Sequence, residues 1–237
     1  MELFFTEKFS PQQTEISLSL EESRHAYKVL RKRSGDMIDL TDGKGHLIRG
    51  EISGKSSGQL NVRIKEFREM PFPKANHITV ALSIVRPNRM NWAVEKLTEL
   101  SVEKIVPIIC HYNTTRNFKS DHLRRISISA LKQSQQFYLP KICEPIQFKK
   151  WLIETGKQNF LKFIAQPDGK TVNTVNFADN VNKNIFVVIG PEGGFKQEEA
   201  DLAAKYYFQP LNLGQTILRT ETAAVVAVAQ LKLFLTS

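Results

Sequence analysis

Short, partly apolar stretches separated by polar, glycine-containing segments mark the first 70 residues of the chain. Short strands are predicted at Met37–Leu40, His46–Ile52 and Leu60–Phe67, because glycine-containing turns separate these stretches. A helix is predicted over Leu20–Leu30, which ends in a basic run at residues 31–33. The pattern therefore predicts a small β-rich domain that carries one helix.

The pattern changes after residue 76, where strands and helices alternate. The run Ile78–Val85 predicts a buried strand, and apolar residues at helical spacing predict a helix over Met90–Leu100. Further strands are predicted at Ile105–Cys110, Phe160–Ala165, Ile185–Ile189 and Pro210–Leu213, with helices near 120–137, 197–207 and 221–235. Strands that are apolar throughout are buried on both faces, which indicates a parallel α/β sheet.

The boundary between the two patterns is predicted at Met70–Pro73. Proline lacks the amide hydrogen and restricts the residue before it, so this segment continues neither a helix nor a central strand. We therefore expect a first domain over residues 1–70, a linker over residues 71–76 and an α/β domain over residues 77–237.

The net charge of the chain indicates what kind of partner it binds. The 237 residues include 33 Lys and Arg against 24 Asp and Glu, which gives a net charge of +9 and suits a polyanion. The excess is concentrated between residues 76 and 143, where 10 basic side chains accompany 4 acidic ones. A basic surface is therefore expected on the early part of the second domain.

Cysteines and apolar runs argue against several other classes. Cys110 and Cys143 have neither metal-ligand nor CxxC spacing, so we expect no metal site, no disulfide framework and a reducing cytoplasm. The first twenty residues lack the pattern of a signal peptide. The longest apolar run, Ala223–Ala229, is far shorter than the roughly 18 residues that a membrane-spanning helix needs.

A glycine loop follows the apolar strand in the segment Ile185–Phe195, which reads IFVVIGPEGGF. Ligands of α/β sheets bind at such strand ends, and glycines let a ligand approach the backbone closely. The spacing matches neither the dinucleotide nor the phosphate-loop fingerprint, which disfavours enzymes that use those loops. On glycine content alone, a tight turn without a ligand is an equally good interpretation.

A second glycine turn lies in Leu213–Ala223, LGQTILRTETA, and leads into a nearly wholly apolar helix. Arg219 and Glu221 stand at the mouth of that helix, where charge is costly unless it is paired or used. The structural alternative is that Thr220 caps the helix and Glu221 complements its dipole. For Glu221 this alternative is slightly favoured over catalysis.

Together, IGPEGGF and LGQTILRTETA resemble the two C-terminal motifs of the ribosomal RNA small subunit methyltransferase E family. The resemblance extends over essentially the whole chain, including residues 89–100, Gln133-Ser134 with Pro140, His25 and residues 29–31. It implies a PUA-like β-barrel followed by a SPOUT α/β domain with a C-terminal trefoil knot, in a homodimer. It also implies methyl transfer from S-adenosylmethionine to uracil N3 in 16S ribosomal RNA.

The resemblance places the cofactor between the loop after the Ala165 strand, the glycine loop and residues 213–222. The cofactor-binding residues that it implies are Ala165, Gln166, Ile189, Gly190, Pro191, Glu192, Gly193, Gly194, Leu213, Gly214, Ile217, Leu218, Arg219 and Thr222. Such a pocket, mostly apolar with few fixed polar groups, suits a compact S-adenosylmethionine. No metal is required.

Methylation of uracil N3 requires stabilisation of the negative charge that spreads to the flanking carbonyl oxygens. Arginine suits this task, and Arg219 is the first candidate, with Arg89 as the second catalytic residue. The residues predicted to bind RNA are Arg24, His25, Arg31, Arg33, Arg86 and Arg116. The alternative for the first four is a solvated helix end. Arg116 is also a candidate for holding the base, but RNA binding alone is favoured because it lies in the polar stretch Asn113–Lys119.

Four positions depart from the pattern of the family. Arg86 replaces a lysine, Ser101 a glycine, Gln136 an arginine, and Lys196 a serine that would cap the following helix. Two other functions stay open at this point: a SPOUT enzyme acting on a ribose 2′-hydroxyl or a guanine, and a non-catalytic RNA-binding or ribosome-assembly protein. The second of these would not need both glycine segments intact.

Overall fold

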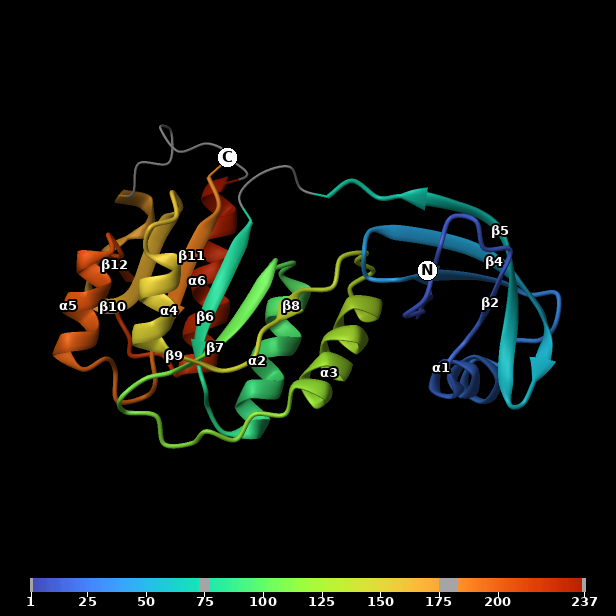
Figure 1. The fold of residues 1–237 in the computed structure, drawn as a ribbon, viewed down its shortest axis with the longest axis horizontal. Coiled ribbons are helices and arrows are strands. Elements are labelled where there is room, and N and C mark those ends of the chain that lie inside the picture. Colours follow the sequence, from blue (N-terminus) through green and yellow to red (C-terminus); the bar gives the residue numbers. More distant parts are fainter. Residues whose placement is uncertain (1, 73–76, 175–182, 236–237) are drawn as a thin grey trace. The chain divides into compact units, whose positions relative to one another are not determined.

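The computed structural model describes residues 2–72, 77–174 and 183–235 (Figure 1). The chain packs as two compact units. One contains Met1–Phe72 together with Ile128–Leu139, and the other contains Pro73–Ser127 and Pro140–Ser237. Most of the predicted linker, residues 73–76, lies outside the described residues, and the boundaries set above stay a prediction.

The first unit is built on a five-stranded sheet with strand order β1-β3-β4-β5-β2. Its strands are β1 (Leu3–Phe5), β2 (Glu15–Ser17), β3 (Met37–Thr41), β4 (His46–Ser56) and β5 (Gln59–Glu69). The strands β3, β4 and β5 form an antiparallel meander, as the predicted turns imply, and β1 joins β3 in parallel. The expectation of a small β-rich domain is confirmed.

The predicted helix over Leu20–Leu30 is present but not uniform. It begins as α1 (Leu20–Arg24), where the Ser19 hydroxyl accepts from the Glu22 amide at 3.1 Å, and continues as a π-helix over His25–Val29. The change from α-helix to π-helix could not be predicted from the spacing of apolar residues. The buried side of this segment, Ala26, packs on the apolar face of the sheet with Phe4 and Leu40.

A second apolar cluster in the first unit involves residues far along the chain. Leu3 and Phe5 of β1 pack against Leu131, which lies in the last turn of α3 (Ser120–Gln133). The Lys132 ammonium also donates to the buried Glu22 carboxylate. Residues 128–139 are therefore an integral layer of the first unit.

The second unit contains a seven-stranded sheet with strand order β12-β10-β11-β6-β7-β8, and β9 also pairs with β7. Every pairing in it is parallel, as predicted. The strands are β6 (Ile78–Ser83), β7 (Lys104–Ile109), β8 (Lys141–Ile142), β9 (Ile146–Gln147), β10 (Leu161–Thr171), β11 (Ile185–Ile189) and β12 (Gln209–Asn212).

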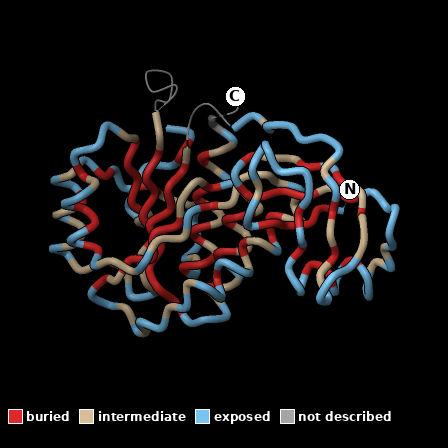
Figure 2. Tube along the Cα trace, turned by 45° about the vertical axis from the view of Figure 1, so that its right-hand side comes forward, coloured by how far each residue is buried: buried red, intermediate tan, exposed pale blue. Residues whose placement is uncertain are grey.

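Helices cover both faces of this sheet, so alternate residues of each central strand enter different cores. Val80 and Leu82 of β6 pack with α2 (Pro87–Glu99) and α6 (Thr220–Leu235), whereas Ala81 packs with α4 (Phe148–Thr155) and α5 (Gln197–Lys205). Buried positions accordingly run along the strands in Figure 2. Double coverage explains why these strands lack polar alternation.

Candidate active site

The carboxyl ends of three neighbouring strands bring the predicted cofactor segments to one edge of the sheet (Figure 1). Ile164 of β10 pairs with Val188 of β11, and Ala165 of β10 pairs with Leu211 of β12. The chain near residue 166 and the segments that begin near residues 190 and 213 therefore lie side by side. The predicted loop after Ala165 is instead part of β10, which continues to Thr171 with an irregular pairing to β12 between Ala165 and Lys170. This is the edge at which open α/β sheets bind ligands.

Hydrogen bonds tie these segments to one another. The Thr220 hydroxyl at the start of α6 donates to the Gly190 carbonyl at 2.9 Å, which fastens the helix to the glycine loop. The Asn212 side-chain amide donates to the Pro167 carbonyl, and its oxygen accepts from the Gly214 amide at 2.8 Å. Polar side chains at the strand ends thus hold all three segments in place.

The glycine positions differ in what they require. Gly194 and Gly214 have φ angles of +73° and +141°, which L side chains rarely adopt, and a Cβ on either would meet no atom within 4 Å. A Cβ at Gly190 would lie 2.8 Å from the Phe195 ring, and one at Gly193 would lie 3.1 Å from the Tyr112 Cβ. Gly194 and Gly214 are therefore required for their backbone conformation, whereas Gly190 and Gly193 are required because a neighbouring side chain lies close to the position that a Cβ would occupy.

Arg89 connects α2 to both motif segments. Its guanidinium forms an ion pair with Glu192 of the glycine loop, and its Nε lies 3.6 Å from Glu221 Oε1 in the first turn of α6. The Glu221 side chain is only 10% exposed, and its Oε2 has no hydrogen-bond partner within the described residues. Sequence reasoning treated Glu221 mainly as a dipole complement, because nothing in the local pattern indicates a partner 132 positions away.

Arg219 lies in the same segment as Glu221 but differs from it in exposure. It is exposed, whereas Thr220 and Glu221 after it are buried. Of the apolar residues before it, Ile217 is 98% exposed and Leu218 is half-buried against the core of the sheet. The segment therefore exposes the apolar side chain of Ile217 and the guanidinium of Arg219, which forms no ion pair within the described residues.

The remaining residues predicted for the cofactor site are buried or half-buried, or belong to the exposed part of the glycine loop. Ile189 is buried at the end of β11, while Ala165, Gln166, Pro191, Leu213 and Thr222 are half-buried. Ala165 and Gln166 lie within β10, Ile189 ends β11, and the other predicted cofactor residues lie on the loops after β11 and β12 and on the first turn of α6.

Asn113 supports this edge and was not among the predicted site residues. Its side-chain oxygen accepts from the Cys110 amide at 2.6 Å and from the Ser83 hydroxyl at 3.0 Å, and its amide donates to the Ile84 carbonyl at 2.7 Å. It thereby joins the ends of β6 and β7.

Burial raises the pKa of the Cys110 thiol, which keeps it protonated and unsuited to nucleophilic attack.

The start of α5 compensates for the departure at Lys196. This residue is the N-cap without a side-chain cap hydrogen bond, as its lack of an acceptor predicts. Glu199 supplies the other half of a capping box, because its Oε2 accepts from the Lys196 amide at 3.0 Å. Its Oε1 accepts from the His111 amide at 2.9 Å, so one carboxylate orders two loops.

The residues predicted to bind RNA divide between the two units. Arg24, His25, Arg31 and Arg33 lie on the first unit around the π-helix, and Arg86 and Arg116 lie on the second. All six are exposed, and within the described part of the chain none forms an ion pair. Arg86 is the N-cap of α2, and Arg116 lies in the loop before α3.

The described residues of the chain contain neither a metal-binding cluster nor a membrane-spanning helix. They contain no cluster of three or more His, Cys, Asp or Glu side chains placed to hold a metal ion. They also contain no helix long and apolar enough to cross a membrane.

The fold and these loops define the class of protein. Residues 72–232 match the RNA methyltransferase domain family, and residues 19–65 match the RNA methyltransferase PUA domain. A knot is not directly visible in the strand order and stays a prediction.

Relatives then identify the particular family. Ribosomal RNA small subunit methyltransferase E of Rickettsia conorii is 31% identical over 93% of this chain and 90% of its own length. The structure of that enzyme from Neisseria gonorrhoeae, bound to S-adenosylmethionine, is 27% identical with a TM-score of 0.86, over 99% of this chain and 98% of its own. The structure of a Legionella pneumophila methyltransferase with bound cofactor SAM is 27% identical to this chain. Its TM-score is 0.87, and the match covers 98% of this chain and 97% of that one. The chain belongs to the ribosomal RNA small subunit methyltransferase E family.

Proposed function

We propose that the protein uses S-adenosylmethionine to methylate N3 of a uridine in 16S ribosomal RNA of the small ribosomal subunit. Membership of the family supports an S-adenosylmethionine-dependent enzyme that acts on small-subunit ribosomal RNA. The observation that carries the proposal is the meeting of both glycine segments, Arg89 and Glu221 at one sheet edge. A protein that only binds RNA has no need of this arrangement.

The residues at the edge fit the cofactor. The half-buried Leu213 and Leu218 offer an apolar wall to the adenine, and open space at Gly194 and Gly214 lets a ligand reach the backbone. The buried Oε2 of Glu221 adds an acceptor that has no partner among the described residues. When bound, S-adenosylmethionine supplies an electrophilic methyl group.

The arginines have different roles in this proposal. We assign to Arg219 the stabilisation of the charge that develops on the uracil carbonyl oxygens, because it is exposed and directly precedes Thr220, whose hydroxyl contacts the glycine loop. Arg89 is held by Glu192 and Glu221, and it sets the position of the glycine loop relative to α6. Because Glu221 Oε1 lies 3.6 Å from Arg89 Nε, we assign Glu221 to the positioning of Arg89.

RNA contact is proposed for the exposed cations of both units. On the first unit, Arg24, Lys28 and Arg31 are exposed and close in sequence to the exposed Tyr27, and the Lys55 ammonium lies 4.7 Å from its ring centroid. Cations beside an exposed aromatic ring suit a strand with unstacked bases. The match of residues 19–65 to an RNA methyltransferase PUA domain supports this use of the surface.

A homodimer is also proposed. Helix α6 is apolar around its circumference, and Leu233 near its end is 65% exposed although the opposite side is buried. Such a helix favours a second apolar partner surface. Light scattering at low micromolar concentration is expected to give roughly twice the chain mass of 27.0 kDa, and a monomer would contradict a closed twofold assembly.

The decisive experiment compares nucleosides of small-subunit ribosomal RNA from cells with and without the gene. Mass spectrometry is expected to show that 3-methyluridine is lost with the gene and restored by the purified protein with S-adenosylmethionine. Loss of a 2′-O-methyl nucleoside or a methylguanine would transfer the proposal to that atom. Calorimetry is expected to show binding of S-adenosylmethionine but not of ATP or NAD, because the loops match neither phosphate fingerprint.

A further inference from the structure

A cleft in the second unit lies between the start of α2 and the start of α3, and it has a volume of about 320 Å³. Its basic lining comes from Lys119, His122 and Arg125, which were not among the residues predicted to bind RNA. All three side chains are exposed. The cleft and the candidate active site share the first turn of α2, because Asn88 and Met90 line the cleft and Arg89 between them contacts Glu192 and Glu221.

The charges in this cleft are uncompensated. Among the described residues, no Asp or Glu lines it, and no ion pair joins Lys119 or Arg125 to a carboxylate. The region of sequence that supplies it, residues 76–143, carries 10 basic and 4 acidic side chains. An anion that enters would therefore meet cations that have no competing partner.

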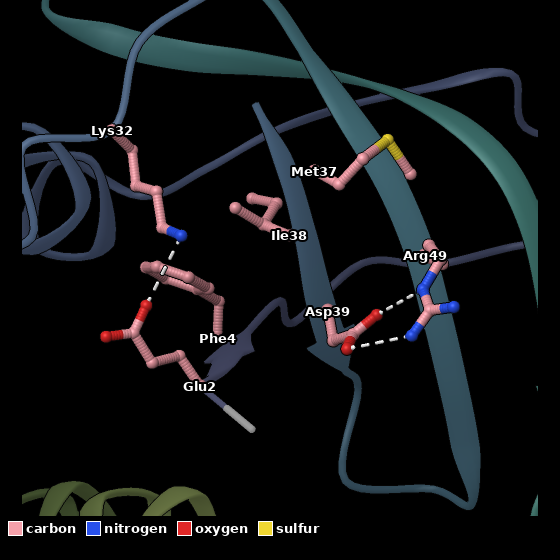
Figure 3. Close-up of a pocket in the computed structure, with 7 residues that line it drawn as sticks. All are labelled: Glu2, Phe4, Lys32, Met37, Ile38, Asp39 and Arg49. Atoms are coloured by element: carbon pink, nitrogen blue, oxygen red, sulfur yellow. Dashed lines mark hydrogen bonds and ion pairs between the residues drawn. The ribbon is translucent and has the colours of Figure 1, made fainter. Parts of the chain in front are cut away.

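A pocket of about 270 Å³ on the first unit shows the contrasting case (Figure 3). There the Arg49 guanidinium donates to both Asp39 oxygens at 2.9 and 3.3 Å, and Lys32 lies 3.5 Å from Glu2. Each cation of that pocket already faces a carboxylate, so an anion would have to compete with it. Uncompensated cations distinguish the cleft on the second unit.

Other groups in the cleft match the rest of a nucleotide. Met90 and Leu123 are buried beneath it, and the half-buried Phe118 adds an aromatic ring to the apolar floor. Asn88 and Asn91 also line the cleft, and their side-chain amides can both donate and accept hydrogen bonds. An apolar floor with an aromatic ring, amides and cations are the groups that hold a single-stranded nucleotide.

We infer that this cleft binds one nucleotide of the RNA strand that flanks the methylated base. Its backbone phosphate lies against Lys119 and Arg125, and its base or ribose covers the apolar floor. The inference rests on the proposed function, since it takes the ligand to be the substrate RNA. The cleft would then fix the register of the strand, so that a base next to it reaches the site beside Arg89.

The test removes the two cations that face the phosphate and keeps the cofactor site. The variant Lys119→Gln with Arg125→Gln is compared with the matched control Lys149→Gln with Lys150→Gln. The control removes the same charge from exposed positions on α4, which covers the opposite face of the sheet from α2. Affinity for a short single-stranded RNA that contains the target uridine is measured over a range of salt concentrations.

The cleft variant is expected to bind RNA roughly tenfold or more weakly than the wild type. The slope of log affinity against log salt should become shallower by about 1.4, because each cation that no longer neutralises a single-strand phosphate reduces the slope by about 0.7. Cofactor affinity should stay that of the wild type, and KM for RNA should rise more than kcat falls. The control should retain the salt slope and the RNA affinity of the wild type.

Two results would overturn the inference and leave the proposed function standing. One is a cleft variant with the wild-type salt slope; the other is an equal loss of RNA affinity in the cleft variant and the control. Photo-crosslinking provides a second readout, because a 4-thiouridine next to the target is expected to label the peptide that contains Phe118. Failure of the wild-type protein itself to methylate the RNA would instead contradict the proposed function.

Discussion

Replacing Arg89 by methionine should destabilise the second unit, because it leaves the buried Glu221 carboxylate without its cation. The two charged groups lie 3.6 Å apart, and the Glu221 side chain is 10% exposed. Removing one partner of a fully buried pair costs about 3–5 kcal/mol. Because the Arg89 side chain is 28% exposed and solvent screens it, we expect about 2–3 kcal/mol in the free energy of unfolding.

A double-mutant cycle isolates this interaction. Glu221→Gln removes the charge but leaves Arg89 paired with the exposed Glu192, so we expect only about 1 kcal/mol. With both changes together, the loss should fall short of the sum by about 2 kcal/mol. Arg86→Met is the matched control on the same helix, since Arg86 is exposed and forms no ion pair within the described residues, and it should change stability by less than about 0.5 kcal/mol.

Urea unfolding followed by tryptophan fluorescence is a suitable assay, because Trp92 and Trp151 are the only tryptophans of the chain and both belong to the second unit. The signal therefore reports on the unit that contains the ion pair. Additive losses in the cycle, or an Arg89→Met variant as stable as the control, would refute the reasoning.

Three further outcomes concern single positions. Arg219→Ala should keep cofactor affinity and lose roughly a hundredfold in single-turnover methylation, with partial rescue by lysine; a wild-type rate at saturating RNA would reduce Arg219 to a structural role. Gly193→Val should abolish S-adenosylmethionine binding in calorimetry without unfolding the chain, since even a Cβ there lies 3.1 Å from Tyr112; unchanged affinity would exclude this loop from the site. Ser101→Gly should raise stability by about 1 kcal/mol in thermal unfolding, because Ser101 has a φ of +51°, whereas Ser101→Ala keeps the strain and should bring no gain.

Local patterns predicted the strands and helices that surround the site. The continuous apolar run of β11 and the glycines after it indicated both a buried strand and a ligand edge, and the structure confirms the parallel sheet. Helix α4 was not predicted, although Phe148, Trp151 and Leu152 have helical spacing. It follows the two-residue strand β9 directly, so no turn or cap residue announces its start.

The contacts that organise the site could not be predicted, because they join residues that are remote in sequence. Arg89 reaches Glu192 and Glu221 only once the parallel order of β11 and β6 is established. Sequence motifs identified Arg89, Glu192 and Glu221 separately as candidate functional residues. Their pairing depends on the topology of the sheet, which no local periodicity encodes.

The inclusion of residues 128–139 in the first unit affects how that unit is completed during protein synthesis. Its strands β1 to β5 are all translated by residue 69, yet Leu3 and Phe5 meet Leu131 only after the chain has grown about twice as long. Domains generally fold as units as the chain leaves the ribosome. Here the apolar side of the amino-terminal unit that Leu3 and Phe5 form stays uncovered until the end of helix α3 has emerged.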